Sequence, residues 1–183
     1  TNVTSGDYNN IETLEIGGGA TAVDLSKFDS ALETVEVETT AGVSLTKVAA
    51  SHDIETVDGA TVTIVSGTSD EAAFIASGDL TIANTSTGAS VVDLTLSFSS
   101  NSASTLTLTG TATETLVIDD ASAAVAIVGS AITAAASAVT SIDASGLTTA
   151  VTVGVAAGTG AGSISSLILG SGDDTAYIDG GQA

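Results

Sequence analysis

The chain has 183 residues, 22 acidic side chains against two basic ones, and no Cys, Met, Pro or Trp, which gives a formal net charge of −20. The absence of Cys excludes a disulfide-stapled fold and a Cys-ligated zinc site. Two Lys and no Arg exclude a basic groove, so no nucleic acid is expected as a partner. No apolar run approaches the ~18 residues of a membrane span, so no membrane insertion is expected.

Short segments of alternating apolar and polar residues, rich in β-branched side chains, predict strands with one buried face. In chain order they are 14–16, 34–37, 61–65, 80–82, 94–96, 105–109 and 151–153. Turn-forming Gly, Asn, Asp and Ser separate them. The Ala-rich stretch 130–139 fits either a helix or a coil of small residues that faces a crowded interior, and the sequence leaves both open.

A repeated unit organises these strands. Residues 11–15 recur as 32–36 and as 54–58, at offsets of 21 and 22, and 139–143 recur as 164–168. Such periods indicate a solenoid, in which each coil completes the core of its neighbour. We therefore predict a single all-β domain over residues 1–183, a right-handed parallel β-helix of about seven or eight coils. A β-sandwich is the alternative, because it also has short, closely spaced strands.

The carboxylates are unevenly distributed, with 14 of the 22 in the first 80 residues. Several alternate with apolar residues and are expected to point outward, in ladders at one-coil spacing: Glu12, Glu15, Glu33, Glu36 and Glu55. Like charges about 5 Å apart repel one another. Such ladders favour either the recruitment of cations or a dependence on ionic strength.

The segment 169–181 resembles the calcium-binding nonapeptide of RTX proteins, with Leu169 and Ala176 as departures from the pattern. The resemblance implies a Ca²⁺ cofactor and these candidate metal ligands: Gly170, Gly172, Asp173, Asp174 and Asp179. Glycines permit backbone conformations that aim carbonyls at one point, and carboxylate oxygens suit a hard cation. Asp174→Ala is then expected to lower the melting temperature in calcium but not in chelator.

A second segment, 67–75, aligns with 170–178 without a gap. Asp70 and Glu71 would take the positions of Asp173 and Asp174, although Ser69 replaces the second glycine. Two interpretations stay open for this segment: a second, weaker metal site, or common coil ancestry without an ion.

The stretch 139–153, together with the Thr-, Ser-, Ala- and Gly-rich composition, resembles the RTX-type surface-layer proteins of Gram-negative bacteria that are exported by type I secretion. The resemblance implies an internal or C-terminal-region fragment of an extracellular, cell-surface structural protein. Its partners would be copies of itself in a calcium-dependent lattice, with lipopolysaccharide bound through other parts of the full protein.

Two other classes of function compete with this interpretation. A surface-binding module, such as an adhesin or an ice-binding face of Thr rows, is the first, but we expect the other coils to place Glu or Ser beside the Thr run at 105–115. An enzyme is the second. Because His52 is the only His and is expected in a solvent-facing turn, no catalytic residue is assigned, although a pair of carboxylates acting on a neutral glycan stays open.

Overall fold

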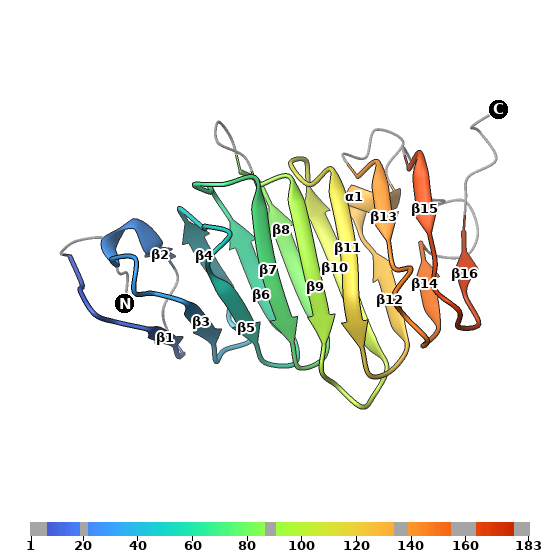
Figure 1. Ribbon diagram of the computed structural model, residues 1–183, viewed down its shortest axis with the longest axis horizontal. Helices are drawn as coiled ribbons and strands as arrows, with labels where there is room; N and C mark the ends of the chain where they lie inside the picture. Colours follow the sequence, from blue (N-terminus) through green and yellow to red (C-terminus); the bar gives the residue numbers. More distant parts are fainter. Residues whose placement is uncertain (1–6, 19–21, 87–90, 134–138, 155–163, 178–183) are drawn as a thin grey trace.

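The computed structural model describes residues 7–18, 22–86, 91–133, 139–154 and 164–177. Across these residues the chain winds as a solenoid, and successive strands alternate between two sheets that face each other (Figure 1). Every named strand pairs in parallel with the strand two places away in the sequence. The predicted all-β parallel solenoid is thereby confirmed, and the sandwich alternative is excluded.

Each sheet contains eight strands. We call the first the odd sheet; its strands are β1 (Thr13–Ile16), β3 (Thr34–Val37), β5 (Asp53–Thr56), β7 (Glu71–Ala76), β9 (Asp93–Phe98), β11 (Thr115–Ala121), β13 (Ser141–Asp143) and β15 (Ser166–Ile168). The second is the even sheet, with β2 (Ala22–Asp24), β4 (Val43–Thr46), β6 (Ala60–Ile64), β8 (Leu80–Asn84), β10 (Ser104–Gly110), β12 (Val125–Val128), β14 (Val151–Val153) and β16 (Thr175–Ala176).

Period-two alternation explains why the strands form where they do. In β10, Leu106 and Leu108 are buried while Thr105, Thr107 and Thr109, which alternate with them, are half-buried. The predicted bounds 34–37 and 151–153 coincide with β3 and β14. No such pattern marks β7, because its Ala-rich residues alternate in burial without alternating in polarity.

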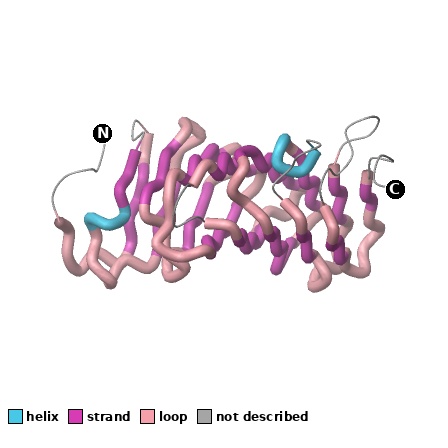
Figure 2. The backbone as a smooth tube through the Cα atoms, turned by 90° about the horizontal axis from the view of Figure 1, so that it is seen from above, coloured by secondary structure: helices cyan, strands magenta, loops and turns pink. Residues whose placement is uncertain are grey.

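The buried apolar side chains form one core between the two sheets, whose strands are the magenta segments in Figure 2. Because neighbouring strands are parallel and in register, inward side chains stack in columns along the solenoid. Ile54, Phe74 and Leu96 form one such column in the odd sheet, and Val62, Ile82 and Leu108 form one in the even sheet. Burying each of these side chains, relative to leaving it exposed to water, stabilises the folded chain by about 1.5–3 kcal/mol.

The register confirms one predicted offset and corrects another. Thr13 pairs with Thr34, as the offset of 21 requires. The next offset is 19 rather than 22, because Val35 pairs with Ile54. In this register Thr56, which the repeat aligns with the half-buried Thr34, points inward between Val37 and Ala76.

Helical structure is limited in the described residues to a 3₁₀ turn, η1 (Leu25–Lys27), and one α-helical turn, α1 (Ser130–Thr133). The helix that the sequence allowed over 130–139 is therefore present in its first four residues. Ala131 and Ile132 are buried. Residues 134–138 of that stretch lie outside the described residues.

Candidate functional site

The predicted calcium-binding turn joins β15 to β16, at the edge where odd strands lead into even strands. Gly170, Gly172, Asp173 and Asp174 are in this turn, whereas Asp179 lies outside the described residues. Asp173 is exposed and Asp174 is half-buried. The turn therefore presents one carboxylate fully to solvent and holds the other against the preceding coil.

Both glycines in this turn are required by the close approach of the preceding coil. A Cβ on Gly170 would overlap the carbonyl oxygen of Leu147, and one on Gly172 would overlap that of Thr149. The Ser171 N–H donates a hydrogen bond to the same Leu147 carbonyl, at 2.9 Å. Coil stacking is thus sufficient to explain Gly at both positions.

Asp174 also has a structural role. Its Oδ1 accepts a hydrogen bond of 2.9 Å from the Val151 N–H. In the previous coil the equivalent donor, the Val125 N–H, is bound by the main-chain carbonyl of Ala150 at 3.0 Å. The carboxylate of Asp174 therefore replaces a main-chain carbonyl at the start of an even strand.

Two other aspartates have this role at the same edge. Asp58 Oδ1 accepts from the Asp79 N–H, and Asp79 Oδ1 accepts from the Thr105 N–H, both at 2.7 Å. These bonds join consecutive coils. Asp at this edge is thus a recurrent acceptor for main-chain N–H groups, including where no nonapeptide is present.

The second candidate segment, containing Asp70 and Glu71, has similar local geometry. The Thr68 N–H donates to the Val48 carbonyl at 2.6 Å, as Ser171 does to Leu147. However, 67–70 joins β6 to β7, whereas 170–174 joins β15 to β16. The two segments therefore lie on opposite edges of the solenoid, so they are not successive turns around one ion. In the parts of the chain that the structure describes, no three Asp, Glu, His or Cys side chains form a group that could hold a metal ion.

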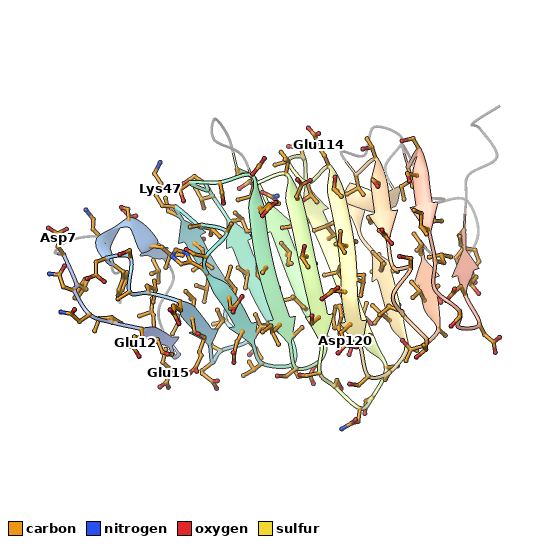
Figure 3. All side chains as sticks on the ribbon, in the orientation of Figure 1. Asp7, Glu12, Glu15, Lys47, Glu114 and Asp120 are labelled. Carbon is orange, nitrogen blue, oxygen red and sulfur yellow. The ribbon has the colours of Figure 1, made fainter. Side chains whose placement is uncertain are left out.

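The outer face of the odd sheet is acidic, as the sequence predicted. Its strands carry nine carboxylates, each exposed or half-buried: Glu15, Glu36, Asp53, Glu55, Glu71, Asp93, Asp119, Asp120 and Asp143. We call this surface the acidic face. Glu15, Glu36 and Glu55 are consecutive partners in the register and form the predicted ladder. Glu12 and Glu15 point away from the first coil, and Asp120 lies near the C-terminal end of β11 (Figure 3).

Asp143, on β13 of the acidic face, accepts hydrogen bonds from a neighbouring serine. Hydrogen bonds from the Ser145 side chain and main chain lower its pKa. The Ser145 N–H is 2.9 Å from Asp143 Oδ1. This bond favours the ionised carboxylate, so it maintains negative charge on the acidic face.

The outer face of the even sheet is different. Strands β4, β6, β8, β10, β12 and β14 contain no Asp, Glu or Lys, and their outward side chains are small and half-buried. We call this surface the uncharged face; its residues are Ser44, Thr46, Thr61, Thr63, Thr81, Ala83, Thr105, Thr107, Thr109, Ala126, Val128 and Thr152. Asp24 on β2 is the only carboxylate within the strands of this sheet.

The uncharged face corrects the expectation for the Thr run. Beside Thr107 the preceding coils place Thr81 and Thr61, not Glu or Ser. The run also leaves this face after Thr109, because Gly110 has a φ of +97° and turns the chain. Thr113 is consequently buried and accepts a hydrogen bond of 2.8 Å from Asn84 Nδ2.

His52 is also placed differently from the prediction. It is 8% exposed rather than solvent-facing, and its Nδ1 accepts a hydrogen bond of 3.2 Å from the Ala49 N–H. Burial lowers the pKa of its imidazole, which favours the neutral form. Its main-chain N–H also donates to the Ala49 carbonyl at 3.0 Å, so His52 closes the turn ahead of β5.

The uncharged face has a sequence pattern of its own, separate from the repeat that predicts the coils. Thr-Val-Thr at 61–63, Thr-Ile-Ala at 81–83 and Thr-Leu-Thr at 107–109 recur at coil spacing without a carboxylate. The repeat of residues 11–15 at 32–36, which predicts the coils, belongs to the odd sheet and therefore does not reveal this pattern.

Comparisons with protein-family models, with curated proteins and with solved structures found no match. Among the helices in the described residues, none has the length and apolar character needed to cross a membrane. The basis for a functional proposal is therefore the arrangement of this chain's own residues.

Proposed function

We propose that the chain is a structural segment of an extracellular surface-layer protein and assembles with copies of itself in a calcium-dependent lattice. The observation that carries the proposal is the separation of charge between the two broad faces: nine carboxylates on the strands of the odd sheet, and one on those of the even sheet. Cations that neutralise the acidic face would let neighbouring copies approach, while the uncharged face needs no counter-ion.

The solenoid architecture supports a structural role. Coils stack through continuous main-chain pairing in both sheets, from β1 to β15 and from β2 to β16. Such a rod keeps its two broad faces at a fixed orientation over its length. Rigid elements of this kind suit repeated lateral contacts better than they suit a closing active site, so no enzymatic activity is proposed.

The turn at 170–174 is where we propose calcium binding. Asp173 supplies an exposed carboxylate, and Asp174 has a second oxygen besides the one that accepts from Val151. Main-chain carbonyls near Gly170 and Gly172, together with the following repeat that begins at Asp179, would complete an oxygen-only site. An ion bound only by the folded form would raise the free energy of unfolding by about 2.7 kcal/mol when the free calcium concentration is a hundredfold above the Kd.

The double role of Asp174 determines how calcium binding is tested. Asp174→Ala removes the acceptor for the Val151 N–H, so it is expected to lower the melting temperature in chelator as well as in calcium. This replaces the sequence-based expectation of an effect in calcium alone. Asp173→Ala removes only the exposed carboxylate and is therefore the calcium-specific probe.

The measurement is differential scanning calorimetry on a chain extended past Ala183, with calcium and with chelator. We expect Asp173→Ala to match the unsubstituted protein in chelator and to melt earlier in calcium. Equal melting temperatures of the unsubstituted protein in the two conditions would rule out calcium binding.

Assembly is tested separately by electron microscopy of the full protein in calcium, in chelator and in sodium chloride of matched ionic strength. Ordered two-dimensional sheets are expected in calcium alone. Sheets that form equally well in sodium chloride would show that screening is sufficient without a specific ion. If the protein stays monomeric in every condition and binds a polysaccharide, the surface-binding module would be favoured.

A further inference from the structure

We propose that the uncharged face packs against the same face of a second copy of this chain, in a two-fold contact between sheets. The proposal rests on the self-assembly proposed above and names the surface that makes one of its contacts. No residue of the candidate calcium-binding turn takes part in it.

Of the two broad faces, the uncharged face meets the least electrostatic repulsion from a second copy. The chain has a net charge of −20, and the acidic face opposes the approach of another acidic surface. Six consecutive strands of the even sheet, β4 to β14, offer a broad area with no charged side chain. Two copies that meet through this area place no carboxylate of these strands against another.

The register of the even sheet makes the face self-complementary. Thr61, Thr81 and Thr107 are consecutive partners and form a straight column of methyl and hydroxyl groups. Thr63, Ala83 and Thr109 form a second column two residues further along the strands. Columns recur about every 6.6 Å along the strands, and their members about every 4.8 Å across them.

A second copy has columns with the same spacing. The ridges of one copy therefore fit between those of the other, with the sheets about 10 Å apart. A two-fold axis brings identical patches together, which is the usual geometry of contacts between like subunits. Thr hydroxyls that enter the contact can bond to one another across it, so burying them leaves few unpaired groups.

The size of the face predicts the strength of the contact. Six strands about 4.8 Å apart, each about five residues long with a rise of about 3.3 Å per residue, cover roughly 500 Å². A stable interface buries about 800 Å² on each partner. The isolated pair is therefore expected to be weak, and the contact becomes persistent where other contacts hold the copies together.

Cysteine cross-linking tests the contact directly, because the chain has no Cys of its own. Thr81→Cys and Thr107→Cys each place one thiol on the uncharged face. Thr34→Cys and Thr95→Cys are the matched controls, on outward positions of β3 and β9 in the acidic face. The probe is a flexible bis-maleimide that spans more than the ~10 Å between packed sheets.

We expect the two uncharged-face variants to give at least several-fold more covalent dimer than the two controls, at equal protein concentration. Thr95 is exposed whereas Thr81 is half-buried, so thiol accessibility alone would favour the control. Adding Thr63→Lys to Thr81→Cys should return the yield to the control level, and circular dichroism would verify that this variant folds. Equal yields from both faces would overturn the proposal.

A second measurement separates this contact from the proposed lattice. Sedimentation velocity over a concentration series should show reversible self-association of the unsubstituted chain and less of it for Thr107→Lys. If calcium-dependent sheets form but Thr107→Lys forms them equally well, the uncharged face is not a lattice contact and the proposed function stands. If no sheets form while Thr81→Cys still cross-links, the proposed function fails and the contact stands.

Discussion

Thr107 on β10 and Asp93 on β9 are both half-buried and point outward from consecutive strands of one coil, but they belong to faces with different chemistry. Asp93 pairs with the carboxylate of Glu71 in the preceding coil, whereas Thr107 pairs with Thr81 and Val128, which present hydroxyl and methyl groups. The backbone is the same parallel ladder in both sheets. The difference shows that a solenoid can assign separate functions to its faces by choosing the residues of every second strand.

The edges that join the two faces are expected to tolerate less change than either face. Gly170→Ala would force a Cβ into the Leu147 carbonyl of the preceding coil. Because the obstacle is main chain, the coils must separate locally, and we expect a loss of about 3 kcal/mol in the free energy of unfolding. Urea denaturation would measure it.

The calcium hypothesis makes a different prediction for Gly170→Ala. If the glycine is required for coil packing, the loss should have the same size in calcium and in chelator. A loss seen only in calcium would assign Gly170 to the ion rather than to the stacking of coils.

The inner side of the odd sheet contains one polar group that can be removed with benefit. The Thr56 hydroxyl is buried and has no hydrogen-bond partner. Thr56→Val keeps the shape and removes the unpaired hydroxyl, so we expect the free energy of unfolding to rise by about 1 kcal/mol. Thermal melting would measure the gain.

Thr34→Val is the matched control, on the outer side of the same sheet. Its hydroxyl is on the outer side of the sheet, so Thr34→Val should alter the free energy of unfolding by no more than about 0.5 kcal/mol. A loss at Thr56→Val would show that its hydroxyl is satisfied in solution.

Charge removal sharpens the comparison of the two faces. Glu36 lies between Glu15 and Glu55 in the ladder, so Glu36→Gln relieves repulsion on both sides. We expect Glu36→Gln to raise the free energy of unfolding by about 0.5 kcal/mol at low salt, and this gain should decline as added salt screens the charges. Denaturation at low and high sodium chloride would measure it.

The matched change on the uncharged face is Thr81→Ser, which alters no charge. Its effect on stability should be independent of salt, whatever its size. A salt dependence equal to that of Glu36→Gln would contradict the assignment of the repulsion to the acidic face.

The smallest effect concerns pH. Burial lowers the pKa of His52 in the folded chain below its ordinary value of 6.5. The unfolded chain therefore binds a proton at His52 before the folded chain does as the pH falls. The contribution of neutral His52 to the free energy of unfolding is fully present above about pH 6.5 and is lost as the pH falls from there through the folded pKa.

Comparing His52→Gln with the unsubstituted protein across this pH range isolates the contribution of His52. The difference in melting temperature between the two proteins should change in the variant's favour as the pH decreases from neutral. A constant difference would show that the imidazole is solvated in the folded chain.

Much of the fold could be predicted from local pattern. Alternation at 34–37 and 151–153 located β3 and β14 to the residue, and the recurrence of 11–15 at 32–36 identified the coil. The outward direction of Glu15 and Glu36 followed from the same alternation. These features depend only on which residues in a short window are apolar.

The candidate site was less accessible from sequence. Gly170 and Gly172 match a calcium-binding pattern, but they also meet the need of stacked coils for close main-chain approach. Asp174 binds the Val151 N–H, a contact between residues 23 apart that no local pattern encodes. One residue type therefore serves two purposes, and its pattern alone does not separate them.

The sequence by itself determined that the chain forms short strands, that the strands recur as coils and that the carboxylates face solvent, because each depends on polarity within a few residues. Only the tertiary structure decided which sheet each strand joins, and therefore that acidic and uncharged residues lie on separate faces. It also turned Thr56 inward and buried His52 and Thr113. The physical reason is that coil length varies, with Val35 pairing 19 residues onward and Thr115 pairing 26 residues onward, according to how each corner packs against the next.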